Sequence, residues 1–334
     1  MELLLWIGVF VVSLVVLVKG ADWLLASAER IGLACGLSSF IVGVVIVGLG
    51  TSFPEVVSSL SAIMKGAPEI VPANVVGSNI ANILLIVGIS AVVGGRLAVT
   101  KSLIDLDLPL LAVASVLFVG VAWDREVVLG ESILLLATFG IYVAYTIMHK
   151  DDLGEEEEPL EKTPTRTQRR GHLTDMQKTD PVERPKIGAK DIVFLLIGLA
   201  GLMLGANYLI EAVLRLSEII GIGAGVISLA AVALGTSLPE LMVSIKAAWQ
   251  KKPEVALGNI FGSNVFNVLL VMGIPGLFET LRFDEQTFTL GMPVMIVATI
   301  LFIISGISRR IHVYEGAMYI VVYIFFIGRL FGWL

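Results

Sequence analysis

Two short stretches of this sequence place a carboxylate next to hydroxyl side chains. Residues 50–55 read GTSFPE and residues 235–240 read GTSLPE, so Glu55 and Glu240 each follow a proline. The proline removes a backbone donor and leaves a carbonyl of the preceding turn without its helical partner. Each stretch therefore offers a carboxylate, two hydroxyls and a free carbonyl. These oxygen donors suit a hard cation such as sodium or calcium, which takes about six to eight oxygens, whereas a soft metal favours cysteine or histidine.

A second polar motif follows each of these stretches. Residues 74–82 read NVVGSNIAN and residues 259–267 read NIFGSNVFN. Ser78 and Asn82 are four residues apart, as are their counterparts in the second motif, so each Ser and Asn pair shares one helix face. Their neutral oxygens would join the same ion pathway if the four helices meet. Close helix packing through small residues is the alternative explanation, and it applies best to the glycines.

The composition indicates which kind of protein must position these residues. Of 334 residues, 56% are hydrophobic and only 16% are charged, with a formal net charge of −6. The mean hydropathy is +0.91. A water-soluble chain cannot cover so much apolar mass with polar surface. This composition excludes a soluble enzyme, a nucleic-acid binder with a basic face and a disordered chain, and it indicates a helical membrane protein.

Apolar stretches of about 20 residues, the length that crosses a bilayer as a helix, occur ten times. We expect five such spans, then a polar segment, then five more. The expected boundaries are 3–25, 38–63, 71–95, 103–123, 127–148, 191–215, 223–248, 255–280, 287–307 and 313–333.

The polar segment at 149–190 is rich in charge and has no apolar periodicity, so we predict a disordered linker. Its acidic run at 155–158 is an alternative candidate for a crude calcium sensor, although a solvated charge run is the simpler interpretation. With the N-terminus outside, 17 Lys and Arg fall on the inner side, linker included, and five on the outer side. The linker is therefore predicted to be cytoplasmic.

The two halves of the chain repeat one another at a fixed offset, the same offset that separates the two GTS motifs. Between residues 50–89 and 235–274, 18 of 40 positions are identical without a gap. Each copy contains five spans, an odd number, so the second copy must enter the membrane from the opposite side. We therefore predict an all-α membrane protein of ten helices in two inverted repeats, at 1–148 and 191–334. Secondary transporters have this architecture, with a binding site near the midplane.

The paired motifs GLGTSFPE with ANVVGSNIAN and ALGTSLPE with GNIFGSNVFN resemble the two alpha-repeats of the sodium/calcium exchanger family, within the cation/calcium antiporters. The resemblance covers all ten spans and is of the prokaryotic type, with alpha-repeats at 43–89 and 228–274. It implies four cation sites in a diamond, and backbone ligands near Gly48 and Ala233. The implied side-chain ligands are Thr51, Ser52, Glu55, Ser78, Asn82, Thr236, Ser237, Glu240, Ser263 and Asn267.

Asn267 departs from the family pattern, because prokaryotic members often carry Asp at this position and potassium-dependent relatives also use an acid there. The absence of an acid at position 267 argues against potassium co-transport. Two carboxylates remain, with a formal charge of about −2, which one calcium neutralises and three sodium ions exceed by one. The family's exchange of three sodium ions for one calcium is compatible with this chain.

The resemblance implies an antiporter of the plasma membrane that exports Ca²⁺ in exchange for Na⁺ by alternating access, with the first and sixth helices sliding across the others. A proton/calcium exchanger is the first alternative, since two membrane-buried carboxylates can carry protons, and a passive cation channel is the second. We expect no enzymatic activity and no cofactor beyond the transported ions. We also expect contact with membrane lipid, and neither a nucleic acid nor a protein partner.

Overall fold

The computed structural model describes most of the chain, namely residues 2–98, 108–148, 187–220, 236–308 and 310–334. The linker predicted at 149–190 lies almost wholly outside these residues. So do Ala233 and the first half of the span expected at 223–248. The disorder and the cytoplasmic position of the linker therefore remain predictions.

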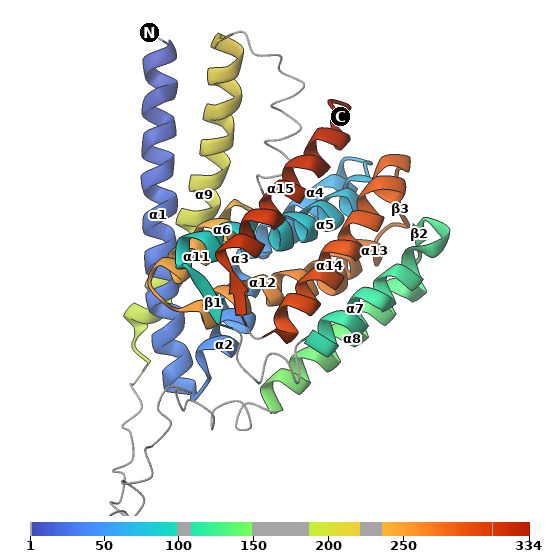
Figure 1. Ribbon diagram of the computed structural model, residues 1–334, viewed down its shortest axis with the longest axis horizontal. Coiled ribbons are helices and arrows are strands. Elements are labelled where there is room, and N and C mark those ends of the chain that lie inside the picture. Colours follow the sequence, from blue (N-terminus) through green and yellow to red (C-terminus); the bar gives the residue numbers. More distant parts are fainter. Residues whose placement is uncertain (1, 99–107, 149–186, 221–235, 309) are drawn as a thin grey trace, which may run out of the picture.

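Two long helices form a pair at one side of the molecule (Figure 1): α1 (Glu2–Cys35) and α9 (Ala189–Ile220). Their backbones touch through glycines. A Cβ at Gly20 would lie 2.8 Å from the Leu202 nitrogen, and one at Gly198 would lie 2.7 Å from the Leu24 nitrogen. Because residue numbers rise along α1 as they fall along α9 at these contacts, the two helices are antiparallel. They are the first helices of the two repeats, so this arrangement agrees with the predicted inversion.

Three spans form the buried centre of the bundle. The apolar stretch of Pro253–Gly276 is 94% buried, against 17% for that of Glu2–Cys35. In each buried span a wider, π-helical turn interrupts the α-helix, which the sequence did not predict. The segments are α2 (Ser39–Ile41), η1 (Val42–Gly48), α3 (Leu49–Thr51) and α4 (Phe53–Met64); α5 (Ile70–Ile80), η2 (Ala81–Val87) and α6 (Gly88–Gly94); and α12 (Pro253–Phe266), η6 (Asn267–Val271) and α13 (Met272–Gly276).

The other described helices pack around this centre (Figure 1). Helix α11 (Leu238–Trp249) is the described part of the seventh span and contacts both α12 and α1. The remaining elements are α7 (Leu108–Val121), η4 (Ala122–Asp124), α8 (Leu129–Met148), η7 (Thr287–Gly291), α14 (Met292–Ile307) and α15 (Val313–Leu330).

Two short antiparallel ribbons join the loops and were not predicted. Strand β1 (Arg96–Ala98) pairs with β4 (Arg310–His312), and β2 (Glu126–Val127) pairs with β3 (Leu281–Arg282). The repeat offset places β1 on β3 and β2 on β4. Each ribbon is therefore the repeat counterpart of the other. The duplication thus extends well beyond the polar motifs, and each ribbon ties a strand of one copy to a strand of the other.

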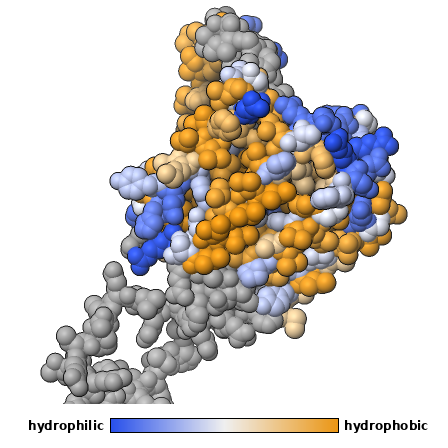
Figure 2. Space-filling model, turned by 45° about the vertical axis from the view of Figure 1, so that its right-hand side comes forward, coloured by the Kyte–Doolittle hydropathy of each residue, from blue (hydrophilic) through white to orange (hydrophobic). Residues whose placement is uncertain are grey.

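Eight of the described helical spans are long and apolar enough to cross a membrane, judged by length and composition. A ninth apolar helix, Leu108–Asp124, is shorter, and the seventh expected span begins outside the described residues. Apolar side chains cover much of the face shown in Figure 2, with hydrophilic residues gathered toward its edges. Exposed apolar residues such as Val116 and Ile324 are suited to contact with lipid. The chain is a helical membrane protein, as predicted.

Candidate ion-binding site

In both stretches that contain a carboxylate, the serine directly before the helix lies outside the α-helical conformation. Helix α3 ends at Thr51 and α4 begins at Phe53, and between them Ser52 has φ −85° and ψ 0°. Ser237, directly before α11, has nearly the same values, φ −87° and ψ 3°. A ψ near zero belongs to the bridge region and turns the chain out of the α-helix. The break predicted before Pro54 is therefore present, and in both stretches a helix begins directly after the serine.

Glu55 and Glu240 lie in the first turns of α4 and α11, and each is only 1% exposed. The N-terminal end of a helix has a partial positive charge that favours a carboxylate. This partial charge does not replace a counter-ion for a fully buried group. No described lysine, arginine or histidine forms an ion pair with either carboxylate. Within the described part of the chain, no basic side chain offsets a charge on either carboxylate.

One carboxylate accepts hydrogen bonds from both repeats. Ser52 Oγ donates to Glu240 Oε1 at 3.0 Å, and Ser263 Oγ donates to the same oxygen at 3.5 Å. Glu240 Oε2 and both oxygens of Glu55 have no hydrogen bond within the described part of the chain. Ser237 Oγ, the counterpart of Ser52 Oγ, is also buried without a partner there. These buried oxygens are available to a ligand.

The asparagines that follow α5 and α12 present further oxygens. Asn267 Nδ2 donates to Asn79 Oδ1 at 3.0 Å, and Asn267 Oδ1 has no partner among the described residues. Neither amide atom of Asn82 has one either. Asn82 and Asn267 lie in the π-helical turns η2 and η6, a conformation that is frequent at functional sites. Leaving a buried polar group unpaired costs about 1–3 kcal/mol, which a ligand would offset.

Ser78 completes the predicted set of polar side chains. Its Oγ lies 3.4 Å from Thr236 Oγ1, across the interface between the repeats. Burial is what the predicted residues share, because nine of the ten are at most 3% exposed. The hydrogen bonds join Ser52 and Ser263 to Glu240, and Ser78 to Thr236. Among the described residues they join none of these to Glu55.

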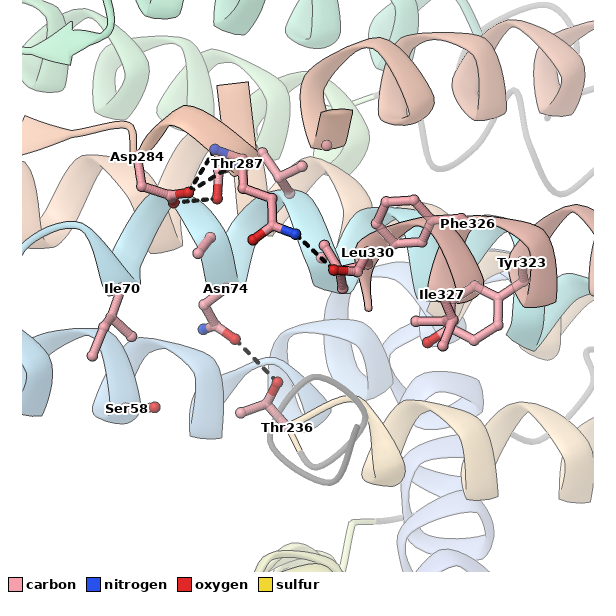
Figure 3. Close-up of a pocket in the computed structure, with 15 residues that line it drawn as sticks. Ser58, Ile70, Asn74, Thr236, Asp284, Thr287, Tyr323, Phe326, Ile327 and Leu330 are labelled. Carbon is pink, nitrogen blue, oxygen red and sulfur yellow. Dashed lines mark hydrogen bonds between the residues drawn. The ribbon is translucent and has the colours of Figure 1, made fainter. Parts of the chain in front are cut away.

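A cavity of about 450 Å³ leads to Thr236, the least buried of the predicted residues (Figure 3). It lies between α5, η7 and α15, and Asn74 and Thr236 are hydrogen-bonded to one another in its wall. Gly77 also lines it, and a Cβ there would meet nothing within 4 Å. At the repeat counterpart, a Cβ on Gly262 would lie 2.6 Å from the Val44 carbonyl oxygen. The glycine of the first motif therefore has open space beside it, whereas the glycine of the second motif is closely packed.

The two backbone ligands implied by the resemblance, Gly48 and Ala233, stay predictions. The Gly48 carbonyl accepts the Ser52 N–H at 3.0 Å and lies 3.4 Å from Thr51 Oγ1, so it is not a free carbonyl. Ala233 lies outside the described residues. A second lone pair of the Gly48 oxygen remains, because a carbonyl can accept two hydrogen bonds.

Sequence reasoning missed the part taken by Asn74 and Asn259. Asn259 Oδ1 accepts a hydrogen bond from Thr51 Oγ1 at 3.1 Å, and Asn74 Oδ1 accepts one from Thr236 Oγ1 at the same distance. The two asparagines are repeat counterparts, and this repetition is the signal that could have marked them as more than packing residues. Which hydroxyl each one binds depends on how the two repeats face each other, and no local pattern encodes that.

No group of three or more His, Cys, Asp or Glu residues that could hold a metal occurs among the described residues. The centre instead combines two carboxylates with neutral hydroxyl and amide oxygens. A permanently held metal usually has more charged ligands, whereas a transported ion must also be released. The inverted repeats and this oxygen-rich centre define a class of protein, the membrane transporters with a binding site between two repeats.

Comparisons with known proteins narrow this class. The model of the sodium/calcium exchanger protein family matches residues 5–148 and 190–332. The sodium/calcium exchanger MaX1 of Methanosarcina acetivorans is 35% identical over 348 residues, with 97% of each chain covered. The solved sodium-calcium exchanger NCX_Mj, soaked with zero Na⁺ and Ca²⁺, matches with a TM-score of 0.78 and 27% identity, covering 98% of this chain and 99% of that one. The chain belongs to the sodium/calcium exchanger family, whose members are transporters rather than enzymes.

Proposed function

We propose that this protein moves Na⁺ and Ca²⁺ in opposite directions across the plasma membrane, and that sodium entry drives calcium export. The main observation in support is the pair of carboxylates, Glu55 and Glu240, buried at the junction of the repeats with unpaired oxygens. MaX1 is named a sodium/calcium exchanger and NCX_Mj a sodium-calcium exchanger, which agrees with this pair of substrates.

The ten predicted side chains are the proposed ligands. Their oxygens match the preference of Na⁺ and Ca²⁺ for oxygen donors, and histidine and cysteine are absent from the set. The two carboxylates come from opposite repeats and supply a formal charge of about −2, equal to that of one Ca²⁺ with opposite sign. Two Na⁺ would balance the same charge, and three would exceed it by one.

The same electrostatics favours exchange over free passage. Burying a carboxylate without a counter-charge costs several kcal/mol, on the order of the Born penalty after relaxation. To face the other side of the membrane, the site must pass through a closed state. With two unneutralised carboxylates, an empty site has a high free energy in this closed state, whereas a site that holds a cation does not. One ion must therefore enter before the other side opens again, which couples the two fluxes.

The α1–α9 pair is the moving part in this proposal. It lies at the edge of the bundle and touches the break before Glu55, since a Cβ on Gly50 would lie 2.8 Å from Leu199 Cδ2 of α9. Sliding of the pair across this glycine would cover one end of the site and uncover the other. With the N-terminus outside, the cavity that reaches Thr236 opens outward, because Asp284 and Leu330 at its mouth lie on that side.

The test is uptake of radioactive calcium into proteoliposomes that contain the purified protein. We expect uptake when Na⁺ is loaded inside and absent outside, and little uptake when Na⁺ is equal on both sides. Uptake driven by a proton gradient instead would favour the proton/calcium alternative. Uptake that continues without any counter-ion gradient would favour a channel and contradict exchange.

A further inference from the structure

Asn259 is a fully buried amide that lies between two proposed ligands without being one of them. Its Nδ2 lies 3.3 Å from the backbone oxygen of Glu240 and 2.8 Å from Ser244 Oγ, and its Oδ1 lies 3.1 Å from Thr51 Oγ1. Its exposed fraction is 0%. Every part of this side chain therefore has a protein partner.

These partners fix which end of the amide faces Thr51. A backbone carbonyl can only accept a hydrogen bond, so the atom next to the Glu240 oxygen must be the amide nitrogen. The other end is then the amide oxygen, which can only accept, and Thr51 must donate to it. The Gly48 carbonyl, 3.4 Å from the same hydroxyl, is also only an acceptor. In the shorter of these two contacts the single hydrogen of Thr51 points toward Asn259, and the lone pairs of the threonine oxygen lie on its other sides.

The same contact occurs a second time with the two repeats exchanged, so that the threonine comes from the second repeat and the asparagine from the first. Thr236 Oγ1 donates to Asn74 Oδ1 at 3.1 Å, and Asn74 Nδ2 donates to Ser59 Oγ at 3.5 Å (Figure 3). The repeat offset converts one set of contacts into the other. In both cases the threonine and the asparagine belong to different repeats.

Other contacts of the site do not occur twice. The bond from Ser52 to Glu240 has no counterpart between Ser237 and Glu55. In two inverted copies that differ in conformation, a contact found in both copies is independent of that conformation. The asparagine–threonine hydrogen bonds are therefore expected to persist in both conformations of the site.

We propose that Asn74 and Asn259 are positioning residues, each of which holds the hydroxyl hydrogen of a threonine from the other repeat so that the threonine oxygen faces the ions purely as an acceptor. Neither asparagine binds the ion itself. This inference rests on the proposed function, because it assigns Thr51 and Thr236 to cation binding. Without the asparagine, the hydroxyl can rotate and turn its hydrogen toward the cation, which weakens binding.

A double-mutant cycle tests the inference on the full-length protein. The variants are Asn259→Leu, which is similar in size but removes the acceptor, Thr51→Val, which removes the hydroxyl, and the two combined. Thr138→Val removes a hydroxyl of α8, outside the site, and is the matched control. The readouts are the KM and the maximal rate for Ca²⁺ and for Na⁺ in proteoliposomes, and the shift in melting temperature that each ion produces in detergent.

We expect each single change to raise the ion KM about tenfold and the double variant to raise it by about the same factor, because both changes disable one oxygen. Thr138→Val should stay within about twofold of the wild type. A purely structural asparagine would instead lower stability without that coupling, and a hundredfold additive loss in the double variant would overturn the proposal. So would an unchanged KM in Asn259→Leu.

Asn259 is deeply buried, so the equivalent cycle with Asn74→Leu and Thr236→Val in the cavity wall provides a second test if Asn259→Leu does not fold. The two hypotheses also fail differently. If wild-type protein shows neither sodium-driven calcium uptake nor an ion-dependent melting shift, the proposed function fails. If the wild type shows both and the cycles are additive, only the role of the asparagines fails.

Discussion

Ser52 Oγ donates a hydrogen bond of 3.0 Å to Glu240 Oε1, although the two residues lie in different repeats and 188 positions apart. The equivalent pair, Ser237 and Glu55, forms no hydrogen bond within the described residues. Since the sequence of both stretches is nearly identical, the difference arises from conformation and not from composition. The described part of the protein forms hydrogen bonds with one carboxylate and not with the other, so the two halves of the proposed site differ in conformation.

Replacing either carboxylate by its amide should abolish exchange. Glu55→Gln and Glu240→Gln keep the shape of the side chain and remove half of the charge that offsets a divalent cation where water is scarce. We expect a loss of at least about a hundredfold in calcium uptake with the protein still folded and inserted in the membrane. Uptake assays and gel filtration in detergent measure both outcomes.

The matched control is Glu279→Gln, an exposed glutamate outside the site, which should leave uptake unchanged. Substantial calcium transport by the Glu55→Gln Glu240→Gln double variant would show that these carboxylates do not bind the transported ion.

The linker can be tested by deletion. Residues 153–184 have no apolar pattern able to build a core, and the two repeats contact each other through their helices and ribbons. We therefore expect that replacing this segment by a short flexible linker retains most of the exchange activity. Uptake measured over a range of calcium concentrations also probes the acidic run, because loss of a calcium-dependent activation in a folded deletion variant would identify it as a regulator.

A third acid at the site should make transport more dependent on pH. Asn267→Asp adds an ionisable group to a site that already has two carboxylates, and acids that share one buried site compete for ionisation. Aspartate can replace the amide donor to Asn79 Oδ1, 3.0 Å away, only when it is protonated. Lower pH should therefore reduce calcium uptake more steeply in the variant than in the wild type, because a protonated acid offsets no cation charge.

Asn267→Ala is the control for this prediction, since it removes the amide oxygen without adding an acid and should leave the slope of the pH profile unchanged. Asn82→Asp, at the repeat counterpart, should behave like Asn267→Asp. If both aspartate variants show wild-type profiles and wild-type calcium affinity, these asparagines pack helices and lie outside the site.

Much of this architecture is readable from the sequence because it was duplicated. The constant offset between the copies revealed the repeats, their inversion and the pairing of Glu55 with Glu240, and the prolines revealed where the helices break. The π-helical turns were not predictable, since no residue type is required for them. The partners of Asn74 and Asn259 were not predictable either, because side-chain contacts between repeats depend on their relative placement.

Two ion pairs anchor α1 to the end of α11 and the turn that follows it, at the end of the site opposite the cavity. Lys246 Nζ lies 2.8 Å from Asp22 Oδ1, and Lys252 Nζ lies 2.6 Å from Glu29 Oε1. The repeat counterparts of the two lysines are Ser61 and Ala67, and those of the two acids are also uncharged, so no equivalent ion pair can form at the other end. These ion pairs should favour the conformation in which the cavity is open.

We therefore expect Asp22→Asn combined with Glu29→Gln to lower the population of that conformation. Partly exposed ion pairs contribute up to about 1 kcal/mol each, so the shift should be roughly twofold to tenfold. A reporter cysteine measures it: Gly77→Cys, in the cavity wall, in a Cys35→Ser background that removes the single native cysteine. Labelling by a membrane-impermeant thiol reagent should slow by that factor. Glu126→Gln, which breaks the ion pair with Arg282 in the β2–β3 ribbon, is the control and should not change the rate. Equal labelling in all three proteins would show that the ion pairs only attach α1 and do not bias its position.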